Sequence, residues 1–258
     1  MTFGRGEAPR LHYNGAFMNR RTLLTLALLA ARAAHAGEDM PVVHVPAPAD
    51  AEWHSYRHAY KAASFFAPYV ATRPLIQAHL QIRPNTEDAP LDGLRIQLQG
   101  ATTQVDIPVD ALGRATLPML KQAYDEDAVL RLNRRKGYYQ FSGRYSIRPR
   151  EDGRYPLAML REACEQLISA QRASGYRLRL LGKECKGVKF IFARGDAAAA
   201  VEVRHAGSSA RIAAQPGLPF ENRSMGPYQV ATVRLADWPA QAEVVPLPGL
   251  LGIGTLYD

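Results

Sequence analysis

The feature that most constrains the fold is a strict two-residue alternation between Tyr138 and Arg148. Successive side chains of a β-strand point to opposite faces, so this run predicts a strand with one buried face and one face in water. The apolar set is Tyr139, Phe141, Gly143, Tyr145 and Ile147, and the other set is Tyr138, Gln140, Ser142, Arg144, Ser146 and Arg148.

The same period recurs across residues 73–150. Turn signals such as Pro84-Asn85, Asp92-Gly93 and Lys136-Gly137 separate the runs, and short strands at this spacing favour a β-sandwich. A helical turn is expected near residues 118–125. The predicted strands are 75–83, 94–99, 103–109, 114–117, 129–134 and 138–148.

Two segments have helical spacing of apolar residues instead. The first is predicted to run from about residue 51 to 66, with Asp50 as its N-cap and Pro68 just beyond its end. The second covers about residues 156–173 and places Cys164 on its buried face. Strands are then predicted at 176–181, 188–193, 199–205 and 228–235.

These patterns predict a β-rich α+β protein of antiparallel sheets, with a sandwich-like N-terminal part, a disulfide-linked helix and a β-meander. We divide the chain into an upstream segment with a cleaved signal peptide (1–36), a linker with an amphipathic helix (37–70), a β-rich domain (71–150), an α+β domain (151–238) and an apolar tail rich in proline and glycine (239–258).

The signal peptide is predicted from residues 18–36. Arg20 and Arg21 form a basic start, residues 23–31 an apolar stretch too short to cross a bilayer, and residues 34–36 an A-x-A cleavage site. The mature protein should begin at Gly37 in the periplasm or outside the cell. The two arginines fit general secretion and the twin-arginine route equally.

Cys164 and Cys185 are the two cysteines of the chain. In an oxidising compartment an even pair predicts a disulfide, here between the second helix and the turn after residue 181. A catalytic thiol or a metal pair is the alternative, but no histidine or further cysteine lies nearby in the sequence.

Without residues 1–36 the chain has 27 basic and 23 acidic residues, a net charge of +4. This mild excess does not indicate nucleic acid as a partner. The mature part has no apolar run of membrane-spanning length. An envelope protein, an acidic glycan or an anionic lipid surface remain as expected partners.

Arg144, Arg148, Arg177 and Arg179 are candidate anion-binding residues, because arginines alternate with tyrosines in this part of the chain. The ordinary interpretation is a sheet with aromatic side chains inside and arginines in water, and the alternation favours it.

His54 and His58 have the four-residue spacing that lets two imidazoles face one metal ion. No motif supplies a third ligand, so polar edges of an amphipathic helix explain the pair equally well, and we predict no cofactor.

No nucleophile elbow, zinc-protease motif or phosphate-binding loop is present. The first hypothesis is a binding or structural module that recognises a protein partner or an anionic envelope component. The alternative is a hydrolase of an envelope polymer, whose carboxylates the sequence does not identify.

Overall fold

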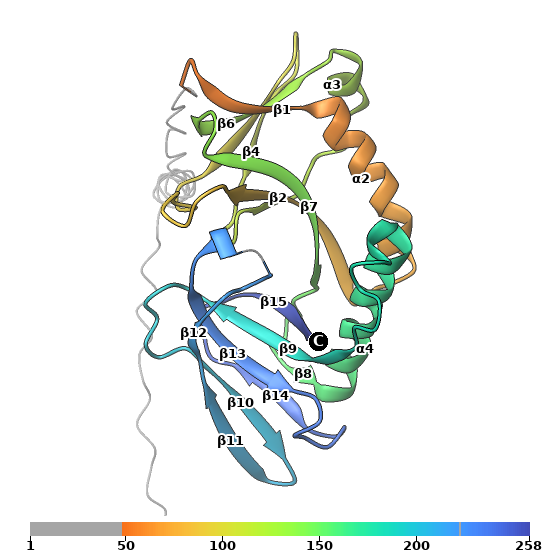
Figure 1. Cartoon of the computed structure of the whole chain (residues 1–258), viewed down its shortest axis with the longest axis vertical. Coiled ribbons are helices and arrows are strands. Elements are labelled where there is room, and N and C mark those ends of the chain that lie inside the picture. Colours follow the sequence, from red (N-terminus) through yellow and green to blue (C-terminus); the bar gives the residue numbers. More distant parts are fainter. Residues whose placement is uncertain (1–47, 222) are drawn as a thin grey trace, which may run out of the picture. The chain divides into compact units, whose positions relative to one another are not determined.

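Antiparallel strands dominate the computed structural model, which describes residues 48–221 and 223–258 (Figure 1). The predicted signal peptide and residues 37–47 of the following segment lie outside the described residues. The strands form three sheets, and every strand pairing in them is antiparallel. The predicted β-rich α+β class is therefore confirmed.

The largest sheet has seven strands in the order β12-β13-β9-β15-β7-β2-β5. Two four-stranded sheets have the orders β1-β6-β3-β4 and β11-β10-β14-β8. The strands of the large sheet are β2 (Ile76–Pro84), β5 (Arg114–Ala115), β7 (Tyr139–Ile147), β9 (Cys185–Phe192), β12 (Gln215–Gly217), β13 (Tyr228–Arg234) and β15 (Leu250–Tyr257). The first small sheet contains β1 (Ala51–Ser55), β3 (Arg95–Gln99), β4 (Gln104–Pro108) and β6 (Val129–Arg135). The second contains β8 (Tyr155–Pro156), β10 (Ala200–His205), β11 (Ser208–Ala213) and β14 (Glu243–Pro246).

Helices lie between these strands in the sequence. None of the helices in the described part of the chain is long and apolar enough to cross a membrane. The helical segments are α2 (Tyr56–Ala71), α3 (Lys121–Asp125), α4 (Leu157–Gln171), a π-helical turn (Arg172–Tyr176) and a 3-10 turn (Arg223–Met225).

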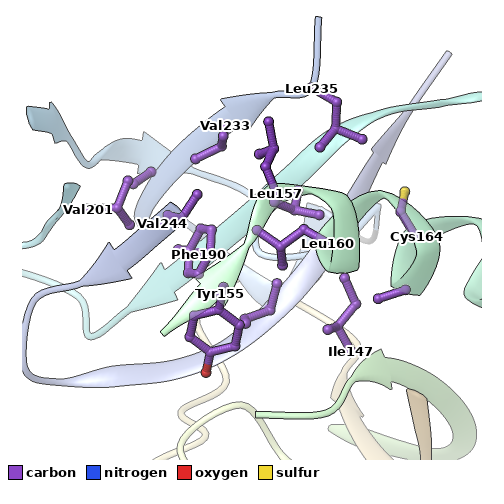
Figure 2. Close-up of a cluster of buried hydrophobic side chains, with 14 of the residues drawn as sticks. Ile147, Tyr155, Leu157, Leu160, Cys164, Phe190, Val201, Val233, Leu235 and Val244 are labelled. Atoms are coloured by element: carbon purple, nitrogen blue, oxygen red, sulfur yellow. The ribbon is translucent and has the colours of Figure 1, made fainter. Parts of the chain in front are cut away.

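Strand β9 is buried on both faces, so it joins two hydrophobic clusters. Phe190 and Phe192 belong to the cluster that α4 covers, whereas Ile191 belongs to the cluster beneath the β1-β6-β3-β4 sheet. In the first cluster, Leu157 and Leu160 of α4 lie against Phe190 and Ile147 (Figure 2). The second cluster contains residues of both this small sheet and the large sheet, and the sandwich-like arrangement predicted for the N-terminal part stays a prediction.

The predicted disulfide between Cys164 and Cys185 is confirmed. Cys164 lies on the buried face of α4 and Cys185 begins β9, with the two Cα atoms 6.0 Å apart. Disulfides of this kind persist in oxidising compartments, outside the cytoplasm in most organisms.

The first helix begins later than predicted. Residues 51–55 form β1, which pairs with β6, and the helix starts at Tyr56 with the Ser55 hydroxyl accepting a hydrogen bond from the His58 N–H group. A side chain that caps a helix fixes its start, and Ser55 rather than Asp50 does so here. Pro68 lies inside the last turns of α2, which continues to Ala71 at the cost of one backbone hydrogen bond.

The strand predicted at residues 176–181 is also absent. Gly175 has a φ of 108°, which turns the chain after α4. The Arg172 guanidinium then donates hydrogen bonds to the carbonyl groups of Leu180 and Lys183. The alternation of Tyr176, Leu178 and Leu180 resembled a strand, but of the three only Leu180 is buried.

The division of the mature chain into domains stays a prediction, and the strand order bears on it. The seven-stranded sheet takes β2, β5 and β7 from residues 71–150 and its other four strands from residues 185–257. The segment described above as an apolar tail contains β14 and β15, and β15 is a central strand. The three parts after residue 70 thus share one sheet.

Candidate functional site

A cavity forms where the seven-stranded sheet opens between β15 and β7. Strand β7 pairs with β2 along nine residue pairs from Ile147 to Tyr139, but it pairs with β15 at one position, Ile253 with Ile147. Beyond Ile147 the two strands diverge, and Figure 1 shows β7 curving away from β15. The separation leaves residues 139–146 of β7 without a strand partner on that side, among the described residues.

Helix α2 faces the opening with small side chains. Only Tyr56 and Ala59 are fully buried among its sixteen residues, both in its first turn. Further along, the Phe66 ring reaches β7 and packs edge-on against the Tyr145 ring, with ring centres 5.7 Å apart, whereas the neighbouring alanines have short side chains. A cavity of about 720 Å³ results, a size typical of sites for small molecules. Its lining from α2 is Ala59, Ala62, Ala63, Phe66, Ala67 and Val70.

The charged residues of the lining are mostly positive. Four arginines and one carboxylate, that of Glu221, face the cavity among the described residues. The arginines come from three parts of the chain: Arg83 from β2, Arg144 and Arg148 from β7 and its end, and Arg179 from the turn after α4. The cavity therefore combines an apolar wall with an excess of positive charge.

Arg144 is largely enclosed, whereas Arg148 and Arg179 are exposed. The Arg144 side chain is 15% exposed, its guanidinium lies 3.9 Å from the centre of the Phe220 ring, and one terminal nitrogen is 3.6 Å from the Glu221 carboxylate. Burial lowers the pKa of Arg144, although the charge of Glu221 acts in the opposite direction. Arginine has so high a pKa that it remains a cation here.

Glu221 is held by two partners. The Tyr257 hydroxyl donates a hydrogen bond to its carboxylate over 3.0 Å, and Arg144 lies on its other side. Burial acts to raise the pKa of Glu221, but the charge of Arg144 and this hydrogen bond outweigh it, so that the pKa lies below its usual value. Burial and the charge of Glu221 raise the pKa of Tyr257 to about 12. One carboxylate therefore neutralises part of the arginine charge and leaves an excess.

Several polar atoms of lining residues are buried without a partner. Among the described residues that line the cavity, these atoms are Nε of Arg83, Nε of Arg144, the hydroxyl oxygen of Tyr145 and Oε1 of Gln171. Buried polar groups in folded proteins are nearly always paired with protein, water or ligand. These four atoms have almost no solvent-accessible surface, so they are covered by protein and do not face the open cavity.

His79 also lines the cavity, and its Nε2 lies 2.8 Å from Oγ of Ser146. Burial, followed by the charge of Arg114, lowers the pKa of His79 to about 4. The histidine is therefore neutral at pH 7. Ser146 is fully buried and does not line the cavity, so the pair positions His79 and does not present a nucleophile.

We expect the neutral state of His79 to make stability depend on pH. The unfolded chain binds the proton at a pKa near 6.5 and the folded chain only near 4, so this stabilisation is complete above about pH 6.5 and is lost as the pH falls toward 4. The loss amounts to at most about 3 kcal/mol. Urea unfolding of wild type and His79→Gln at pH 7 and pH 4 measures it. The glutamine variant should lose less stability on acidification, and equal losses would contradict the assignment.

The structure places the sequence-predicted site residues as follows. Arg144, Arg148 and Arg179 line the cavity, whereas Arg177 is exposed and is not among the lining residues. Arg148 is anchored by hydrogen bonds to the carbonyl groups of Pro74 and Ile76. Anion binding by the four arginines stays a prediction, but three of them share one site.

His54 and His58 are not on one helix face, because His54 lies in β1 and His58 in α2. Their ring centres are 6.2 Å apart, and the His54 ring stacks on Phe141 at 5.3 Å. Burial and then the charge of His58 lower the pKa of His54. Among the described residues no group of three histidine, cysteine or carboxylate side chains could hold a metal ion.

Sequence reasoning missed Arg83, His79, Glu221 and Tyr257. His79 and Arg83 lie in β2, Glu221 lies before the 3-10 turn and Tyr257 lies in β15. No local sequence motif connects these positions. A signal was available for His79 and Arg83, since both occupy polar positions of an alternating strand. The contact of Glu221 with Arg144 depends on how distant segments pack.

The fold and the site define a class in structural terms: an α+β protein whose split antiparallel sheet encloses an arginine-rich cavity. Comparisons of the chain with protein-family models, curated proteins and solved structures found no match.

Proposed function

We propose that this protein binds an amphipathic anionic molecule in the cavity, with an acyl or similar apolar chain along α2 and a carboxylate or phosphate group among the arginines. The observation that carries the proposal is the composition of the lining: four arginines against one carboxylate, facing a wall of alanines, Phe66 and Val70. Electrostatic attraction and hydrogen bonds from guanidinium groups favour an anion. The apolar wall favours a hydrocarbon chain.

The proposed ligand is an anionic envelope component if the predicted signal peptide exports the protein to the periplasm or beyond. The disulfide is compatible with that location.

The other functions considered from the sequence have less support. A protein partner stays a prediction, because no described surface identifies one. A hydrolase that cleaves the glycosidic bonds of an envelope polymer would in most families use paired carboxylates. Glu221 is the one carboxylate among the described lining residues, and Arg144 and Tyr257 engage it.

A fluorescent fatty acid tests the proposal. We expect a dansyl-labelled fatty acid to bind wild-type protein and the matched fatty alcohol to compete at least tenfold more weakly than the unlabelled acid. The Arg144→Gln variant should bind the labelled acid roughly 10- to 100-fold more weakly, because hydrogen bonds to charged groups contribute about 1.5–3 kcal/mol.

Two further variants separate the anion contact from general charge and from folding. Arg179→Gln removes an exposed lining arginine and should weaken binding without affecting thermal unfolding. Arg135→Gln changes the net charge equally but lies away from the lining, with its side chain 77% exposed, and should leave affinity unchanged. An anion site in the cavity would be refuted if wild-type protein bound the fatty acid and the fatty alcohol with equal affinity. It would also be refuted if Arg135→Gln lost as much affinity for the labelled acid as Arg179→Gln does.

A further inference from the structure

The turn after α4, residues 176–183, presents the two most exposed leucines of the described chain. Leu178 is 87% exposed and Leu181 is 77% exposed. Side chains of this size project into water singly on many proteins. Here two of them project from one short turn, so the surface is apolar at that place.

The turn is built by internal contacts, so the leucines are held in this position. Leu180 is 2% exposed and anchors the turn in the protein. The backbone N–H of Leu180 donates to the Tyr176 carbonyl over 3.1 Å, and that of Lys183 donates to the Leu180 carbonyl over 3.1 Å. Arg172 donates to the carbonyl groups of Leu180 and Lys183 from the side. Leu178 and Leu181 thus point outward on a turn that is fixed at both ends.

The charged residues in this stretch of the sequence have one sign. Between residues 166 and 183 there is no acidic residue, and the four charged residues are Arg172, Arg177, Arg179 and Lys183. Arg177 and Arg179 are exposed beside Leu178. The next carboxylate along the chain, Glu184, is paired with Lys186 over 2.9 Å. An exposed apolar tip with a basic border is the arrangement that enters the interface of an anionic bilayer.

The turn also adjoins the opening of the cavity. Tyr176 and Arg179 are exposed, and both line the cavity together with the buried Leu180. Residues that are both exposed and lining mark where the cavity meets solvent. A surface bound through this turn would lie next to that opening.

We propose that residues 176–183 dock the protein onto an anionic lipid surface, with Leu178 and Leu181 inserted among the acyl chains and Arg177, Arg179 and Lys183 at the headgroups. The charge complementarity of the turn and its paired leucines select a lipid surface over a protein partner. The proposal concerns a surface and stands whether or not the cavity binds an anionic ligand.

Vesicle flotation with the full chain tests this docking. We expect wild-type protein to float with phosphatidylcholine vesicles that contain phosphatidylglycerol, and to float at least tenfold less with phosphatidylcholine alone. The Leu178→Ser/Leu181→Ser variant should lose at least tenfold in partitioning to the anionic vesicles. Arg177→Gln/Lys183→Gln should lose a similar factor at low salt, and added salt should weaken wild-type binding. Arg179 is left unchanged because it lines the cavity.

Matched controls identify the turn as the docking site. Trp53→Ser removes a 51% exposed aromatic side chain from β1, and Arg135→Gln removes an exposed charge elsewhere. Both should float as wild type does. The four variants should also bind the dansyl-labelled fatty acid in the absence of vesicles with unchanged affinity, which separates this proposal from the one for the cavity.

Two outcomes would overturn the docking proposal. If wild-type protein does not float with anionic vesicles, the turn has another occupant, such as a protein. If the leucine variant floats as well as wild type, the lipid contact lies elsewhere on the molecule.

Discussion

The Ala63→Trp variant should bind the dansyl-labelled fatty acid at least about 100-fold more weakly than wild type, a loss of about 3 kcal/mol. Ala63 lies on the side of α2 that lines the cavity. An indole there would occupy the space proposed for the hydrocarbon chain. Thermal unfolding should occur at the same or a higher temperature, because the indole covers apolar surface that is now open to solvent.

The control for this substitution is one residue away. Ser64 is exposed and is not among the lining residues, so Ser64→Trp makes a comparable change in α2 outside the cavity. It should bind the probe as wild type does. Ala67→Trp repeats the block from the next turn of the helix. Unchanged probe binding in both blocked variants, with the fold intact by circular dichroism, would show that the ligand binds elsewhere.

Loss of the Cys164–Cys185 disulfide should lower the free energy of unfolding by about 3 kcal/mol. The bond closes a loop with a sequence separation of 21 residues, and the chain-entropy model assigns about 3 kcal/mol to loops of this length. Denaturant unfolding of the oxidised protein and of the protein reduced with dithiothreitol measures the difference, because reduction keeps both sulfur atoms in place.

The double variant Cys164→Ala/Cys185→Ala complements the reduction experiment. It should be less stable than reduced wild type, since Cys164 is completely buried in the cluster beneath α4 and its sulfur atom would be lost. A reduced protein as stable as the oxidised one would mean that the bond contributes nothing beyond the packing of α4 on β9.

Strict periodicity explains why much of the sheet was predictable. The alternation from Tyr138 to Arg148 corresponds to β7, and the other predicted strands of residues 73–150 correspond to β2 through β6. The disulfide was predictable because the chain has just one cysteine pair, with one member on the apolar face of a helix.

Other elements depend on tertiary contacts that leave no periodic signal. In β15 the glycines at 252 and 254 interrupt the alternation, yet they fit close neighbours: a Cβ atom at Gly252 would lie 2.7 Å from the Arg114 guanidinium. At residues 176–181 the pattern predicted a strand, but Gly175 and the hydrogen bonds of Arg172 impose a turn.

The cavity could not be predicted, because it forms where the side chains of packed elements do not fill the space between them. Alanines are ordinary helix formers, and only the packing of α2 in the folded protein shows that its alanines line a cavity. The arginines of β7 were predicted to lie in water, and Arg144 is instead largely enclosed against Phe220. A cation that packs on a ring contributed by a segment 76 residues later in the chain leaves no trace in local spacing.

The position of β15 has a consequence for how the chain reaches its native state. Residues 250–257 pair with β9 on one side and meet β7 at Ile147 on the other, so the two halves of the large sheet join only after this segment arrives. In a chain that is synthesised or exported from its N-terminus, one edge of β9 stays unpaired until residues 250–257 pair with it. Open strand edges recruit strands from other molecules. Residues 250–257 thus cover an edge of β9 that would otherwise be open to strands of other molecules.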